Sequence, residues 1–159
     1  MRNVWMVLAM IALVGVIGST VATARAGTVS GLVIVQSAYS VDETANRLQG
    51  ALQAGGLMVV ARVDHAANAQ RVGKVLRPTQ LLIFGNPQAG TELLQAVQTV
   101  GIDLPQKLLV WEDEAGQVHV AYNDPGYLAQ RHGIVGEDQT LMMIGNALSR
   151  LVMGATTRG

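Results

Sequence analysis

Residues 107–122, KLLVWEDEAGQVHVAY, decide the fold class, because two apolar segments here flank a short polar loop. Segments 107–112 and 117–122 are rich in Leu, Val, Trp and Tyr, which are typical of β-strands. The Asp, Glu, Ala and Gly of residues 113–116 are suited to a four-residue hairpin loop between them. A connection this short joins antiparallel strands, so the sequence predicts at least one antiparallel pair.

The hairpin also predicts which side chains share a face of the sheet. If Glu112 pairs with Gln117, Trp111 lies on the same face as Val118, and His119 lies on the opposite face. This makes His119 a structural residue. A slip of one residue in the pairing would invert these faces.

Three further strands are expected upstream of the hairpin, at residues 31–36, 57–63 and 80–84, where short apolar runs are bounded by turn residues. Apolar residues at helical spacing predict main helices in three places, each with an acidic or hydroxyl residue near its start. The first helix is expected to be capped by Ser40 and to reach Leu52. The second is expected to be capped by Thr91 and to run through Val97, and the last to run from Asp138 to Met153. Shorter helices are expected after Asp64 and over residues 127–131.

This order of strands and helices predicts a single α+β domain. Three of the strands are nearly continuous apolar runs, whereas the strands of a sheet with one solvent-exposed face should alternate apolar and polar residues. Either helices cover both faces, or a second copy of the chain covers one of them. We favour the homodimer.

Composition excludes several classes of protein. The chain has 159 residues, half of them hydrophobic, with no Cys and a formal net charge of zero. The absence of Cys excludes disulfide scaffolds, thiolate zinc sites, iron–sulfur clusters and Cys nucleophiles. The balanced charge argues against a nucleic-acid partner. We expect no cofactor.

Residues 1–26 have the features of a signal peptide, and residues 27–159 form the expected domain. Arg2 precedes an apolar stretch, and Ala24-Arg25-Ala26 is a cleavage pattern. The alternative is an uncleaved N-terminal anchor, since Val4 to Ala22 is about long enough to span a bilayer. We expect cleavage and a periplasmic or secreted domain without membrane contact. Loss of Arg2 and Arg25 makes that domain mildly acidic.

Several ordered motifs resemble those of one family. They are VDH at 63–65, LRPTQLLIFGNP at 76–87, DLPQKLLVWED at 103–113, YNDP at 122–125 and RH at 131–132. Together they resemble the bacterial and archaeal family called domain of unknown function 302. The resemblance covers about residues 36–134, and the helix expected at 138–153 follows it.

The resemblance implies a curved, mainly antiparallel five-stranded sheet with two or three main helices packed on it, and a dimer. It implies no activity. The polar residues that recur in the family fall here on candidate ligand-binding positions, namely Asp64, His65, Arg77, Asn86, Lys107, Glu112, Tyr122, Arg131 and His132.

Each candidate also has a structural interpretation. Asp64 is suited to cap the following helix, and Arg77 either binds an anion or pairs with Glu112 or Asp103. We expect no metal. If one were bound, its ligands would be His65, His132 and a carboxylate such as Glu112 or Asp64, although no metal-binding spacing supports that set.

Three functions remain open from the sequence. The favoured one is an exported small-ligand or sensor-type binding module, dimeric, with a small anionic ligand near the polar strand ends. The second is a structural or protein-interaction domain without a small ligand. The third is an enzyme with His65 or His132 as acid–base and Arg77 holding an anion. The sequence favours binding over catalysis, and it assigns no catalytic residue or substrate.

Overall fold

The computed structural model describes residues 27–29 and 31–158. The predicted signal peptide, residues 1–26, lies outside the described residues. The elements are, in chain order, β1 (Gly27–Val29), β2 (Leu32–Ser37), α1 (Val41–Ala54), β3 (Met58–Asp64), α2 (His65–Arg71), β4 (Thr79–Gly85), α3 (Pro87–Ala96), the 3-10 helix η1 (Gln98–Ile102), β5 (Gln106–Glu112), β6 (Val118–Asn123), α4 (Pro125–His132) and α5 (Asp138–Thr156).

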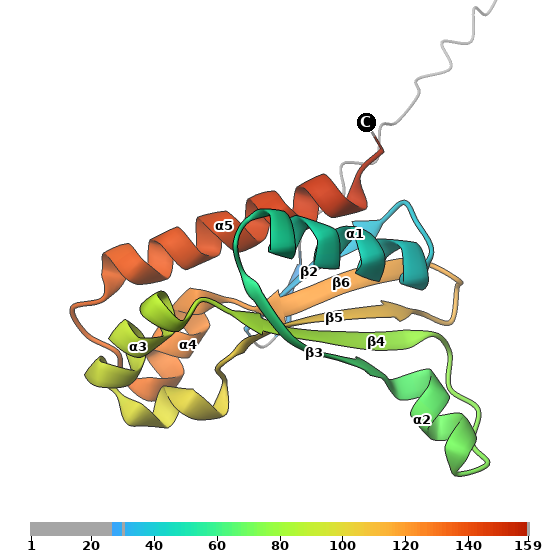
Figure 1. The fold of residues 1–159 in the computed structure, drawn as a ribbon, viewed down its shortest axis with the longest axis horizontal. Coiled ribbons are helices and arrows are strands. Elements are labelled where there is room, and N and C mark those ends of the chain that lie inside the picture. Colours follow the sequence, from blue (N-terminus) through green and yellow to red (C-terminus); the bar gives the residue numbers. More distant parts are fainter. Residues whose placement is uncertain (1–26, 30, 159) are drawn as a thin grey trace, which may run out of the picture.

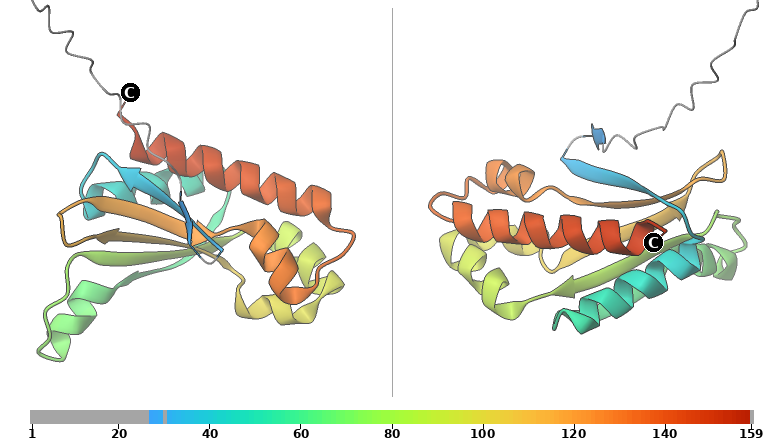
Figure 2. Two further views of the ribbon diagram at one scale, coloured as in Figure 1. Left: turned by 180° about the vertical axis from the view of Figure 1, so that it is seen from behind. Right: turned by 90° about the horizontal axis from the view of Figure 1, so that it is seen from above.

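The strands form one open sheet in the order β1-β2-β6-β5-β4-β3, and every neighbouring pair is antiparallel. The α+β fold predicted from the sequence is therefore confirmed, with the short β1 added beside the five expected strands. Helices α1 and α5 lie on the same face of the sheet (Figures 1 and 2). Among the described helices, none is long and apolar enough to cross a membrane.

The main core lies between the sheet and these two helices. Leu48 and Leu52 of α1 and Val152 of α5 are fully buried against Leu108 and Val120 of the sheet. Because successive side chains of a strand point to opposite faces, each of these strands contributes alternate residues to the core. A core of this kind fixes which face of each strand meets the helices.

A second, smaller apolar cluster closes one end of the molecule. It combines Leu93 of α3, Val100 of η1, Ile134 after α4 and Leu141 of α5. This cluster holds α3, η1 and α4 together beyond the end of the sheet (Figure 1). The two clusters leave a less filled region between them, where the candidate site lies.

Of the three main helices expected from the sequence, α1 and α5 begin where predicted and α3 does not. The Ser40 hydroxyl accepts a hydrogen bond from the Glu43 backbone N–H at 3.3 Å, as the capping box predicts. Helix α3 instead begins at Pro87 and is capped by Asn86, so the prediction of Thr91 as its cap was wrong. Proline is favoured in the first turn because its fixed φ suits a helix and its missing N–H is not needed there.

The predicted hairpin register was wrong by one residue. Glu112 pairs with Val118, and Trp111 pairs with His119, so these two rings share a face and stack with their centroids 5.2 Å apart. The loop closes one residue further on, where the Asp113 N–H donates to the Gln117 carbonyl at 2.9 Å. A three-residue loop forms because Gly116 takes a left-handed φ of 75°.

The face of the sheet opposite α1 and α5 is open over its middle strands. It presents Leu81, Ile83, Leu109 and Trp111, all half-buried. We call these four residues the open-face stripe. Helix α2 flanks this face at one end, and η1 and α4 flank it at the other (Figure 1). Among the described residues, helices thus cover only one of the two apolar faces of the sheet.

Candidate functional site

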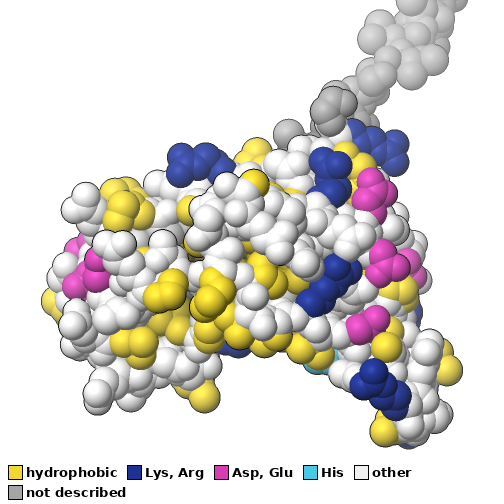
Figure 3. Space-filling model, viewed as in Figure 1, with side chains coloured by type: hydrophobic (Ala, Val, Ile, Leu, Met, Phe, Trp, Pro, Cys, Tyr) yellow, Lys and Arg dark blue, Asp and Glu magenta, His cyan; other side chains and the backbone are white. Residues whose placement is uncertain are grey.

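A cavity of about 820 Å³ lies between α1, α3 and α5 and the ends of β3 and β4. Its apolar wall includes Leu57, Phe84, Leu93, Leu104 and Leu148. Figure 3 shows hydrophobic side chains gathered in the middle of this side of the molecule, below α5. Small-molecule sites in proteins are concave, mainly apolar and of this size. The cavity is therefore the candidate ligand site.

The sequence leaves this region hollow because small residues occupy the positions that face it. Helix α1 ends at Ala54, and Gly55 lines the cavity in the turn that leads into β3. Gly90 of α3 and Ala147 of α5 also line the cavity. A Cβ added at Gly90 would meet nothing within 4 Å. The hollow is thus open enough to take a larger side chain.

Gln106 brings a polar group into this apolar wall. It lies at the start of β5, paired with Phe84 on the face that α1 and α5 cover, and it is 8% exposed. Within the described part of the chain, its amide nitrogen Nε2 is buried without a hydrogen-bond partner. Buried polar groups are almost always paired, so this donor marks a point where a ligand atom would be stabilised.

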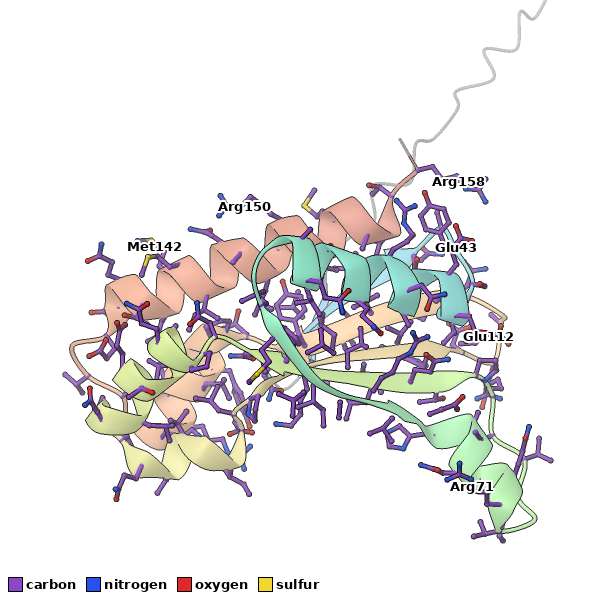
Figure 4. All side chains as sticks on the ribbon, in the orientation of Figure 1. Glu43, Arg71, Glu112, Met142, Arg150 and Arg158 are labelled. Atoms are coloured by element: carbon purple, nitrogen blue, oxygen red, sulfur yellow. The ribbon has the colours of Figure 1, made fainter. Side chains whose placement is uncertain are left out.

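The mouth of the cavity is partly apolar and carries one charge among its lining residues. Met58 and Val60 line it and are 55% and 52% exposed. Asn86, a residue proposed from the sequence, also lines it, but its side-chain oxygen accepts from the Gln88 N–H at 2.9 Å and so caps α3. Arg150 lies on the outer side of α5 (Figure 4). The interior therefore favours neutral ligands.

Asp64 and His65 lie away from this cavity, at the junction of β3 and α2. The Asp64 carboxylate accepts the Ala67 N–H at 2.8 Å, which confirms the predicted cap. His65 is half-buried as the first residue of α2. A helix cap explains the position of Asp64 without a ligand.

Arg77 and Glu112 meet near the same end of the sheet, but not as an ion pair. The Arg77 Nε donates to the backbone carbonyl of Glu112 at 3.3 Å, and its guanidinium lies 3.6 Å from the carboxylate of Glu114. The Glu114 side chain is 91% exposed, so this pair contributes little to stability. The expected partners of Arg77 were Glu112 or Asp103. The structure gives it Glu114 instead.

Lys107, Arg131 and His132 gather around Asp103 at the other end of the molecule. The Lys107 Nζ donates to the Asp103 carbonyl at 2.8 Å, and the His132 Nε2 lies 2.7 Å from the Asp103 carboxylate. Arg131 lies 3.5 Å from the same carboxylate, and His132 Nδ1 lies 3.1 Å from the Thr99 hydroxyl. These contacts tie α4 to η1, so they have a structural role.

Tyr122 is buried on the helix-covered face and is 6% exposed. Burial raises the pKa of its phenol above the usual value of 10.0, and the nearby negative charge of Asp124 adds to the shift. The side chain thus belongs to the main core rather than to the cavity.

The nine candidates therefore do not form one site, because Arg77 and Glu112 meet at one end of the sheet and Lys107, Arg131 and His132 gather at the other. The possible metal ligands His65, Glu112 and His132 belong to α2, the end of β5 and α4, and α2 and α4 flank opposite ends of the sheet (Figure 1). Among the residues that the structure describes, no three His, Asp or Glu side chains are grouped to hold a metal ion.

Gln106 was not among the site residues predicted from the sequence. The strand was expected to begin at Lys107, which left Gln106 outside it. Its spacing was the available signal, because Gln106, Leu108 and Val110 alternate along β5 and all face the core. A polar residue in register with two buried apolar ones indicates a buried amide.

Comparison with known proteins finds relatives that are longer than this chain. The fluoride-specific ion channel FluC 1 of Brucella suis biovar 1 (strain 1330) is 50% identical over 105 residues, which cover 66% of this chain and 41% of the relative. FluC 1 of Brucella abortus biovar 1 (strain 9-941) is also 50% identical over 105 residues, covering 66% and 39%. The chain thus spans about two-fifths of the length of these curated relatives.

A solved structure shares the fold. The crystal structure of an uncharacterized conserved DUF302 protein from Bacillus stearothermophilus matches with a TM-score of 0.71 and 22% identity, over 80% of this chain and 98% of that one. The family model described as "Domain of unknown function DUF302" matches residues 33–151, which agrees with the resemblance seen in the sequence. On this match, the chain belongs to the DUF302 family.

Proposed function

We propose that this protein is an exported small-ligand-binding module, periplasmic or secreted, and that its ligand occupies the cavity between α1, α3 and α5. The observation that carries the proposal is the cavity itself, about 820 Å³ in volume, with the buried amide of Gln106 in its wall. Export is supported by the leader-like residues 1–26.

The cavity favours an apolar ligand over the anionic one suggested by the sequence. Among its lining residues only Arg150 is charged, and that side chain lies on the outer side of α5. Burying an anion without a partner is costly. Apolar surface, by contrast, leaves water at a gain of about 25 cal/mol per Å².

A matched pair of glycine substitutions tests this site. Gly90 and Gly50 both lie in helices, and a Cβ at either meets nothing within 4 Å, but only Gly90 lines the cavity. Gly90→Leu should narrow the cavity and weaken binding of the apolar fluorescent probe Nile red, whereas Gly50→Leu should bind it as the unmodified protein does. Both variants should remain folded, because replacing helical glycine adds helix propensity.

The result is read from the fluorescence titration together with circular dichroism. Weaker probe binding by folded Gly90→Leu alone supports the proposal. Equal binding by both variants, or no binding by the unmodified protein, contradicts it.

We also propose that the protein is a homodimer, the state favoured from the sequence, and that it pairs through the open-face stripe. Half-buried Leu109 and Trp111 give this face apolar surface that a partner would cover. Lys107 and Asp113 lie near opposite ends of β5. A two-fold axis through the face would bring the Lys107 of one copy towards the Asp113 of the other.

Sedimentation velocity tests the dimer. Trp111→Lys should yield monomers, because it places a charge within the apolar contact. Met142→Lys, at an exposed position on α5, is the control and should remain dimeric. A monomeric unmodified protein, or an intact dimer of Trp111→Lys, would disprove this interface.

A further inference from the structure

We propose that the ligand is a neutral apolar molecule that carries a carbonyl group, and that Gln106 selects it by donating a hydrogen bond from Nε2 to the carbonyl oxygen. The inference rests on the proposed function, since it names the class of ligand for the same cavity. It begins from a buried donor that has no hydrogen-bond partner among the residues that the structure describes.

Gln106 has no evident structural task that would explain an amide at this position. Its backbone pairs with Phe84 in the sheet, and that pairing does not need the side chain. The next two inward-facing residues of β5 are Leu108 and Val110, both fully buried, so apolar side chains suit this face of the strand. An amide on this face of β5 is therefore explained by a hydrogen-bond partner in the cavity.

Gln80 provides the contrast within the same sheet. It is 6% exposed on the same face of β4, but its oxygen accepts from Arg62 at 2.8 Å and its nitrogen donates to Asp42 at 2.5 Å. The protein thus pairs both polar atoms of one buried glutamine and leaves the amide nitrogen of Gln106 unpaired among the described residues. The difference points to a role of Gln106 in binding.

The partner must be an acceptor, because Nε2 can only donate hydrogen bonds. It must also be neutral. A carboxylate would accept the bond, but it would carry a charge into a wall whose only charged lining residue, Arg150, lies outside the hollow. A ketone, ester, amide or quinone oxygen meets both conditions. A hydrocarbon of the same shape fills the cavity but leaves the donor unpaired.

Three probes of one shape separate these cases. 2-Acetylnaphthalene carries a carbonyl, 2-isopropenylnaphthalene replaces its oxygen with a CH₂ group, and 2-naphthoate carries a charge. Calorimetry on protein expressed from the 159-residue sequence measures each affinity, with Gln106→Leu as the variant. Gln106→Met is a second variant of similar length, should the first fail to fold.

The ratio of ketone affinity to alkene affinity should fall about tenfold in Gln106→Leu, which corresponds to one hydrogen bond of about 1.4 kcal/mol. Comparing ratios cancels the greater intrinsic hydrophobicity of the alkene. The infrared C=O stretch of bound 2-acetylnaphthalene should lie at lower wavenumber in the unmodified protein than in the variant, because a hydrogen bond weakens the carbonyl bond.

Other outcomes overturn the inference in distinguishable ways. If both neutral probes bind and the ratio does not change, the cavity binds apolar ligands without using Gln106, and the proposed function survives alone. If 2-naphthoate binds best and Arg150→Ala removes that preference, the site is one for carboxylates. If no probe binds and Nile red is also excluded, the proposed function fails as well.

Discussion

Replacing Gln106 by Leu should stabilise the ligand-free protein, which is unusual for a substitution in a core. Gln106 is 8% exposed, and its Nε2 is buried without a partner among the described residues. An unsatisfied buried donor costs about 1–3 kcal/mol, and Leu of similar volume removes that cost while adding apolar contact. We therefore expect the free energy of unfolding to rise by about 1–3 kcal/mol.

Gln80→Leu is the matched control and should have the opposite sign. It removes the hydrogen bonds to Arg62 and Asp42, and the charged ends of those residues then have to find water instead. Both partners have exposed side chains, which limits the cost to about 1–2 kcal/mol. Replacing two buried glutamines on one face of the sheet is thus expected to change the free energy of unfolding in opposite directions.

Urea denaturation followed by circular dichroism measures both variants, and thermal denaturation should show a shift of about 4 °C per kcal/mol. An unchanged m value would show that the extent of unfolding is the same. Destabilisation by Gln106→Leu would refute the reasoning, because it would mean that the amide already has a partner in the ligand-free protein.

Three further predictions concern titration and the network at Asp103. The pKa of Asp113 lies below its usual 3.8, mainly through its hydrogen bond with His119, so its contribution to stability is present above pH 3.8 and is lost as pH falls through the lower folded value. Asp113→Asn should flatten this acid limb of the stability curve, measured by urea denaturation at several pH values; an unaltered limb would contradict the pairing. The raised pKa of Tyr122 acts in the other direction, because above pH 10.0 the phenol ionises more readily in the unfolded chain and stability falls. Tyr122→Phe should reduce that alkaline loss, and absorbance at 295 nm should show Tyr122 titrating late; a titration at the ordinary pKa would refute its burial. His132→Ala should cost about 2 kcal/mol, because it removes the 2.7 Å contact with the Asp103 carboxylate and leaves that group with Arg131 at 3.5 Å. His65→Ala should cost under about 0.5 kcal/mol by the same denaturation assay, and equal losses would argue against a structural role for the Asp103 network.

The general fold was predictable because its signals are local. Alternating or continuous apolar runs marked the strands, and capping residues such as Ser40 and Asp64 marked helix starts that the structure confirms. The hairpin at 107–122 was enough to indicate antiparallel pairing. Each of these signals depends on residues within a few positions of one another.

The errors arose where two local options compete. Gly116 permits either a three-residue or a four-residue loop, and the difference of one residue moved His119 to the face of Trp111. Asn86 and Thr91 are both acceptable helix caps, and the adjacent Pro87 favoured the earlier start. Neither choice is decided by the pattern of apolar residues.

The candidate site was harder to predict because it depends on what the fold leaves unfilled. The cavity exists where α1 ends early and where Gly90 and Ala147 contribute little volume, and no motif marks such a combination. The polar residues that attracted notice in the sequence mostly cap helices or tie loops together, as Asp64 and His132 do. The family contributes a fold, without a function that would point to Gln106.

The position of α5 across both apolar clusters has a consequence for how the protein unfolds. Its 19 residues cover the main core and the cavity, and its end is anchored by the Ala38 N–H donating to the Thr156 carbonyl at 2.9 Å. Leu148 and Val152 of this helix belong to the main core, whereas Leu141 belongs to the smaller cluster. Because one helix packs in both clusters, loosening either cluster uncovers apolar surface of the other. We therefore expect the two clusters to unfold together, in one cooperative transition.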